Sequence, residues 1–119
     1  MQSLGSSFRF ALKGIVHAFL KERNMKIHAG VVVLVVAAGF VLGLAPGEWL
    51  PLLLTIALVV SLEMINTAIE SLVDLVTEEY RILAYVAKNV AAGAVLFAAL
   101  VAIIIGLIIF LPHISSFLK

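Results

Sequence analysis

The chain has 119 residues, of which 64% are hydrophobic and 13% charged, with a formal net charge of +1. Such a composition leaves too little polar surface to cover a water-soluble domain, and it predicts a single compact membrane domain. The absence of cysteine excludes disulfides, thiolate metal sites and cysteine nucleophiles. The basic residues flank apolar segments instead of decorating a folded soluble domain, so nucleic acid is not an expected partner.

Residues 4–26 are predicted to form an amphipathic surface helix. A helix of this kind lies in the membrane interface with its cations towards lipid phosphates, or packs against the protein's own bundle, and the two are compatible. The apolar face carries Phe8, Leu12, Ile15, Val16 and Phe19, and the polar face carries Arg9, Lys13, His17 and Lys21.

Three apolar segments follow, and each is within reach of a helix that crosses a ~30 Å hydrocarbon core. The Pro-Gly sequence at residues 45–48 predicts the turn between the first two. Trp49 suits the headgroup boundary at the start of the second, and Pro112 is expected to end the third. The expected spans cover residues 28–45, 49–75 and 86–111.

The cations are distributed very unevenly about these spans. Five of the eight Lys and Arg residues precede the first span, Arg81 and Lys88 lie between the second and third, and only Lys119 falls on the other side. The positive-inside rule therefore places the N-terminus and the 74–88 connection in the cytoplasm. Thr77, which acidic residues follow, predicts the cap of a short cytoplasmic helix that leads to Lys88.

Small residues recur every four positions along the third span, at Ala94, Ala98, Ala102 and Gly106. This spacing lets helix backbones approach closely, so we assign these residues to packing. Three helices alone would shield polar side chains poorly from lipid, and self-association is expected.

A polar stripe of Glu63, Asn66, Glu70 and Asp74 occupies one face of the second span. Its members fall within an arc of roughly 80°, and ionisable groups at membrane depth mark a candidate functional site. Glu63 should lie roughly 10 Å deeper than Glu70 by helical rise, where a desolvated carboxylate suits a general base. Glu70 and Asp74, nearer water, suit a divalent cation, and Asn66 can donate and accept hydrogen bonds. The structural alternative is a stripe that only pairs helices.

Three more polar residues lie on the cytoplasmic side, Glu22 before the first span and Lys88-Asn89 at the start of the third. A deep base, carboxylates for a cation and a lysine for phosphates are the parts of a phosphoryl-transfer site. Without further information, Glu22 and Lys88 are better explained as ordinary interfacial charges. No P-loop or Rossmann fingerprint is present. His28 and His113 are interpreted as interfacial side chains.

The run Glu63-Met64-Ile65-Asn66-Thr67-Ala68-Ile69-Glu70, followed by Val73-Asp74, resembles the signature of the small prokaryotic integral-membrane diacylglycerol kinases. The segments Glu78–Tyr80 and Ala87–Val95 match the same family in order. Glu22-Arg23-Asn24 with Ile27-His28 is similar to its Gram-positive branch, whose members are undecaprenol kinases. The resemblance extends from about Phe8 to Pro112.

The resemblance implies an ATP- and Mg²⁺-dependent lipid kinase at the cytoplasmic face of the bacterial inner (plasma) membrane. It implies a homotrimer of three-span protomers, each with an N-terminal surface helix. The expected reaction transfers the γ-phosphate of ATP to undecaprenol to form undecaprenyl phosphate, with diacylglycerol as the alternative acceptor. The implied roles are Glu63 as catalytic base, Lys88 as the phosphate contact, and Glu22 and Glu70 as metal ligands. The implied active-site polar positions are Asn66, Asp74 and Asn89.

One position departs from the family pattern, which has aspartate directly after the lysine where this sequence has Asn89. Asparagine keeps the shape but cannot serve as an anionic acceptor or a charged metal ligand. An inactive or non-catalytic membrane subunit therefore remains an alternative. So does a small cation-coupled carrier with Glu63 as its transport carboxylate, although no comparable polar stripe exists towards the other side of the membrane.

Overall fold

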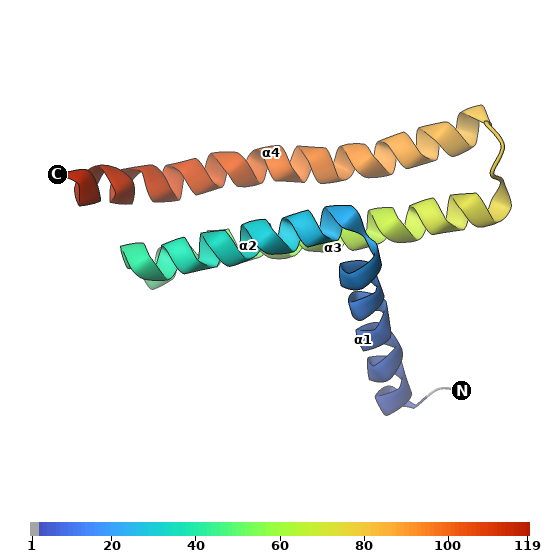
Figure 1. Ribbon diagram of the computed structural model, residues 1–119, viewed down its shortest axis with the longest axis horizontal. Coiled ribbons are helices and arrows are strands. Elements are labelled where there is room, and N and C mark those ends of the chain that lie inside the picture. Colours follow the sequence, from blue (N-terminus) through green and yellow to red (C-terminus); the bar gives the residue numbers. More distant parts are fainter. Residues whose placement is uncertain (1–2) are drawn as a thin grey trace.

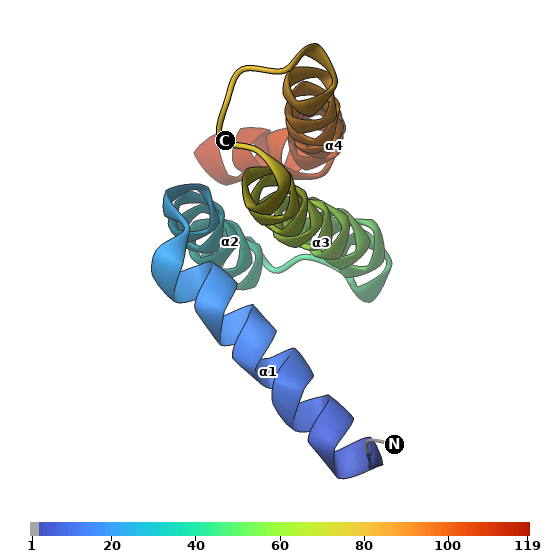
Figure 2. The ribbon, with the colours of Figure 1, turned by 90° about the vertical axis from the view of Figure 1, so that its right-hand side faces the viewer.

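The computed structural model describes residues 3–119, and within them all regular structure is helical (Figure 1). Three helices run side by side, while the first leaves the bundle at a steep angle (Figure 2). The last three are long and apolar enough to cross a membrane, so the prediction of an all-α fold with three such helices is confirmed. The helices are α1 (Leu4–Lys21), α2 (Arg23–Leu42), α3 (Pro46–Val76) and α4 (Ile82–Leu118).

The junction of α1 and α2 is a single extended residue, Glu22, with φ −95° and ψ 123°. α1 thus ends at Lys21, and residues 23–26, expected in the surface helix, belong to α2. Neither Pro nor Gly lies at this break. Instead, Ala18 and Met25 are buried on its two sides, which indicates that packing of α1 against the bundle sets the change of direction.

The turn between α2 and α3 depends on Gly43, the one described residue with positive φ (+71°). Glycine takes this left-handed conformation without steric cost and commonly ends helices. Pro46 begins α3, because its fixed φ suits the first helical turn and its missing N–H is not needed there. The turn therefore comes earlier than the expected residues 45–48. Glu48 closes it by accepting a hydrogen bond from the Ala45 N–H at 3.0 Å.

The connection between α3 and α4 corrects two further expectations. Thr77 ends α3 instead of capping a new helix, because its hydroxyl accepts from the Glu79 N–H at 3.1 Å and so forms part of a turn. α4 begins only at Ile82 and continues through Pro112 to Leu118. A proline removes one backbone hydrogen bond, and neighbouring helices make this tolerable in a membrane bundle.

α3 and α4 share the most extensive contact between helices. A small apolar cluster of Leu44, Leu52 and Ile109 lies towards the α2–α3 turn. Near the same end, the His113 Nε2 of α4 lies 2.9 and 3.0 Å from the two carboxylate oxygens of Glu48. Of the small residues expected to pack, Ala98 is buried, Ala102 and Gly106 are half-buried, and Ala94 is exposed.

Unlike a water-soluble protein, the bundle exposes most of its large apolar side chains. Many large apolar side chains of α2, α3 and α4 point outwards, as expected of helices that face lipid. The buried side chains include Glu63, Asn66 and Thr67 of α3. The interior of the bundle therefore accommodates the polar groups that lipid would exclude.

The tight packing of Gly39 on α2 against Trp49 on α3 predicts that position 39 is sensitive to substitution. A Cβ there would lie 2.6 Å from Cη2 and 2.9 Å from Cζ2 of Trp49, the single tryptophan. We expect Gly39→Ala to displace this ring and destabilise the protein by about 1–3 kcal/mol, the usual cost of overpacking. Thermal unfolding in detergent and the tryptophan emission spectrum measure both effects.

The matched control is Gly30→Ala on the same helix, where a Cβ meets nothing within 4 Å. It should leave the emission unchanged. Equal stability and emission for the two variants would show that α2 and α3 do not pack closely at Trp49.

Candidate functional site

The difference in helix length positions the polar stripe. α3 has 31 residues and α2 has 20, which at 1.5 Å per residue corresponds to roughly 46 and 30 Å. Because α2 ends and α3 begins at the same turn, the C-terminal part of α3 extends with the start of α4 beyond α2 (Figure 1). Glu63 lies beside the first turns of α2, whereas Glu70 and Asp74 belong to the extension.

Glu63 is buried among the helices, with 3% of its surface exposed. Its carboxylate Oε2 lies 3.6 Å from Nε2 of His28 on α2. The side chain of His28 is 22% exposed against 4% for that of Glu63, so the imidazole lies on the more open side of the pair. A buried carboxylate is costly unless it has a partner, and His28 supplies one.

His28 is the functional candidate that sequence reasoning missed. The sequence favours an interfacial role for it, because no second histidine lies at ligand spacing. Its position in the second turn of α2 places it level with Glu63 when α2 and α3 are antiparallel. The matching depth of His28 and Glu63 along antiparallel helices is the sequence signal that could have identified His28.

Asn66 and Glu70 form the next pair along α3. The Asn66 side chain, 4% exposed as a residue, donates from Nδ2 to Oε1 of Glu70 at 3.3 Å. Its Oδ1 and the Oγ1 of Thr67 are buried and have no hydrogen-bond partner among residues 3–119. Such atoms are energetically costly in a folded protein, which makes them candidates for contact with a substrate or another chain.

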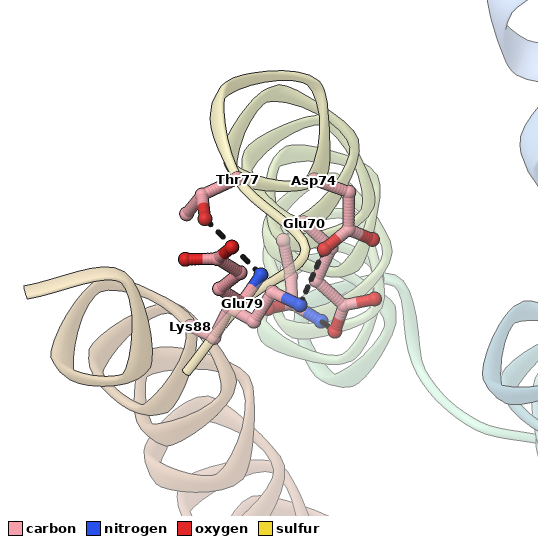
Figure 3. A network of polar contacts seen from close by, with 6 residues as sticks. Glu70, Asp74, Thr77, Glu79 and Lys88 are labelled. Carbon is pink, nitrogen blue, oxygen red and sulfur yellow. Dashed lines mark hydrogen bonds and ion pairs between the residues drawn. The ribbon is translucent and has the colours of Figure 1, made fainter. Parts of the chain in front are cut away.

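Asp74 and Lys88 connect the extension of α3 to α4. Lys88 Nζ donates to Asp74 Oδ1 at 2.6 Å, as Figure 3 shows. The side chain of Lys88 is 39% exposed and that of Asp74 is 53% exposed, so water screens this ion pair. Asn89, the next residue, is exposed.

Glu22 stands apart from these pairs. Its side chain is half-buried at the α1–α2 junction and makes no hydrogen bond or ion pair within the described part of the chain. Nor do any three His, Asp or Glu side chains of residues 3–119 gather closely enough to hold a metal ion. Residues 3–119 of the chain thus form the pairs His28–Glu63, Asn66–Glu70 and Asp74–Lys88, and the side chains of Glu22 and Asn89 take part in none of them.

Buried and half-buried carboxylates in a three-span bundle, with a lysine at its polar end, are features suited to a membrane enzyme that handles phosphate. Residues 9–110 match the family of prokaryotic diacylglycerol kinases. The chain belongs to this family and is a lipid kinase.

Relatives with known names agree with this assignment. The chain is 45% identical over 106 residues to an undecaprenol kinase of Bacillus subtilis, covering 89% of this chain and 86% of that protein. It is 46% identical over 111 residues to a diacylglycerol kinase of Synechocystis sp., covering 92% of this chain but 63% of that protein. The Escherichia coli K12 diacylglycerol kinase is 31% identical over 104 residues, 87% of this chain and 85% of the relative. The carrier alternative gains no support from these relatives.

The exposed Lys88–Asp74 ion pair predicts that its loss lowers activity strongly and stability very little. Lys88→Met and Asp74→Asn should each change the free energy of unfolding by less than about 1 kcal/mol, because exposed ion pairs contribute little. Each should nevertheless lower kcat/KM for ATP by about a hundredfold or more, since Asp74 positions the ammonium group of Lys88 at the polar end of the site. Thermal unfolding and steady-state kinetics give the two values.

Arg81→Gln provides the control, since Arg81 pairs with Glu79 at 3.3 Å in the same connection and both side chains are exposed. It should alter neither quantity. A large stability loss with unchanged kinetics in the Lys88 variant would assign that pair to structure instead.

Proposed function

We propose that this chain transfers the γ-phosphoryl group of MgATP to the terminal hydroxyl of undecaprenol, forming undecaprenyl phosphate at the cytoplasmic face of the plasma membrane. The observation that supports it most directly is the burial of Glu63 among apolar helices beside the start of α2. There a lipid hydroxyl could arrive from the bilayer and ATP from the water. The Bacillus relative, an undecaprenol kinase, favours the polyprenol as acceptor.

In this proposal the membrane surface lies near the α1–α2 junction. α1 would lie in the interface, with its exposed Phe8 and Leu12 in lipid and its cations towards phosphates. The extension of α3 and α4 would project into the cytoplasm, as the excess of Lys and Arg on this side predicts. ATP would then reach Lys88 without entering hydrocarbon.

The proposed chemistry is an in-line transfer. The lipid oxygen attacks the γ-phosphorus, the bond from that phosphorus to the bridging oxygen breaks, and its electron pair leaves with ADP. The hydroxyl proton passes to the carboxylate of Glu63, whose burial removes competing water. Lys88, held by Asp74, offsets the phosphate charge, and the free Oδ1 of Asn66 is available to orient a donor.

The carboxylates of Glu22 and Glu70 are proposed to hold Mg²⁺. Mg²⁺ prefers oxygen ligands and is usually held by one or two carboxylates together with substrate phosphates. Two separate glutamates suit this mode, and Asn66 fixes one oxygen of Glu70 and leaves the other for a ligand. Bound there with ATP, the ion would neutralise charge on the transferring phosphate.

We further propose that the site is completed between protomers of a homotrimer. The side chains of Glu22 and Asn89 make no hydrogen bond or ion pair with the stripe among residues 3–119, and the buried Oδ1 of Asn66 and Oγ1 of Thr67 have no hydrogen-bond partner there. Packing the extension of α3 against a second copy would bring further groups to these atoms and shield the stripe.

Replacing the proposed base should slow phosphoryl transfer severely. Purified protein in vesicles with radiolabelled ATP should phosphorylate undecaprenol, and Glu63→Gln should lower kcat by about 10²–10⁴-fold, the usual contribution of a general base. Glu78→Gln, an exposed glutamate of the connection, is the matched control and should keep full activity. The same assay with diacylglycerol in equal amount identifies the preferred acceptor. This comparison is needed because the Synechocystis and Escherichia coli relatives are diacylglycerol kinases.

Asn89→Asp is assayed beside the unmodified chain, and we expect its activity to be equal or higher. If neither protein phosphorylates undecaprenol while diacylglycerol is accepted, the polyprenol proposal is wrong. If neither accepts any lipid alcohol, the proposed reaction fails for this chain.

A shared site makes mixed trimers informative. Glu22→Gln and Glu63→Gln protomers, each inactive alone, should regain a measurable fraction of activity when unfolded together and reassembled. Recovery follows because some sites then combine an intact Glu22 with an intact Glu63 from different chains. Reassembly of each variant with itself is the control, and no recovery in the mixture would place both residues in one protomer.

A further inference from the structure

We infer that Thr67 is a further catalytic residue, whose hydroxyl donates a hydrogen bond to a non-bridging oxygen of the γ-phosphoryl group as this group passes from ATP to the lipid. The inference rests on the proposed function. Its starting point is a buried hydroxyl on α3: Thr67 is 7% exposed, and its Oγ1 has no hydrogen-bond partner among residues 3–119.

The hydroxyl of Thr67 leaves the nearby backbone carbonyls unused. A threonine inside a helix can bond to the carbonyl three or four residues earlier, which here belongs to Met64 or Glu63. Oγ1 of Thr67 bonds to neither, nor to any other group in the described part of the chain. Since a buried hydroxyl without a partner lowers stability, this arrangement indicates a partner that the chain does not itself supply.

Thr67 lies on the polar stripe between the proposed base and a proposed metal ligand. It follows Glu63 by four residues and precedes Glu70 by three, which is roughly 6 Å and 4.5 Å along α3. It also lies within about 40° of Glu63 around the helix axis, so the two residues share a face. In an in-line transfer the γ-phosphorus passes from the leaving oxygen, near Glu70, to the attacking oxygen, near Glu63. Thr67 is at the level of that passage.

The chemistry of a hydroxyl suits this place. Phosphoryl oxygens accept hydrogen bonds and therefore require donors. Of the two buried oxygens without a partner, Oδ1 of Asn66 can only accept, whereas the hydroxyl of Thr67 can donate. A neutral donor also costs less to bury among apolar helices than a lysine or arginine. The hydrogen bond would stabilise charge on the transferring group, and Thr67 would form no bond to phosphorus.

Thr67→Val replaces the hydroxyl by a methyl group of similar size. We expect kcat for lipid phosphorylation to fall about a hundredfold, as when one donor of an oxyanion hole is removed, with KM for undecaprenol unchanged. Thr67→Ser, which keeps the hydroxyl, should retain most of the activity. The thermal unfolding midpoint of Thr67→Val should equal or exceed that of the unmodified chain, because the variant loses no hydrogen bond within the chain.

Thr55→Val is the matched control, since Thr55 is half-buried on the same helix, eight residues before Glu63 and roughly 12 Å from it along the axis. It should leave kcat unchanged. A Thr67→Val protein with full activity would overturn the inference. So would one that unfolds earlier or no longer assembles, because the hydroxyl would then bond to a second copy of the chain.

MgADP with aluminium fluoride, which mimics the γ-phosphoryl group in transit, tests the contact without turnover. In vesicles that contain undecaprenol, calorimetry should show about a hundredfold weaker binding of this mixture by Thr67→Val and equal binding of MgADP alone. Equal affinities of the two proteins for the mixture would refute the inference even if the chain is active on undecaprenol. If the variant binds the mixture more weakly but the unmodified chain phosphorylates no lipid, the contact stands and the proposed reaction fails.

Discussion

The burial of charge inside an apolar bundle is the constraint on which the rest of the structure depends. Lipid cannot solvate a carboxylate, so Glu63 must face other helices and must find a partner there. α3 turns Glu63 and Asn66 inwards, and α2 brings His28 to within 3.6 Å of the Glu63 carboxylate. The outward face of the helices is left to apolar side chains, as a membrane requires.

Because α3 is longer than α2, the side chains of the site become steadily more exposed from its buried end to its polar end. Along α3, exposure increases from Glu63 through Glu70 to Asp74, whose carboxylate binds Lys88 of α4. A reaction between a lipid alcohol and a nucleotide needs such a change in exposure, because one substrate is dissolved in the membrane and the other in water. In the proposed kinase site, Glu63 at the buried end acts as the base, and Lys88 at the exposed end contacts phosphate.

Much of the architecture follows from composition and periodicity. Apolar runs long enough to cross a bilayer predicted the three long helices, since the cost of exposing backbone in lipid leaves little else possible. The ends were less predictable. Pro46 begins a helix and Pro112 lies inside one, because a proline's effect depends on whether its missing N–H is needed at that place.

The polar stripe itself was visible in the sequence, since residues three and four apart share a helix face. Glu63, Asn66, Glu70 and Asp74 were chosen on this basis, and their catalytic and metal-binding roles remain predictions. Thr77 was misassigned because a hydroxyl can cap a helix or close a turn, and only the path of the following chain decides.

What the sequence determined by itself is local: which segments are apolar, which face of α3 is polar, and, through its motifs, which family the chain belongs to. These properties are encoded in residues near one another along the chain. The tertiary structure decided the partners, because His28 and Glu63, or Lys88 and Asp74, meet only when helices pack. The depth at which each helix starts and ends sets those contacts, and no periodicity within a single helix contains that information.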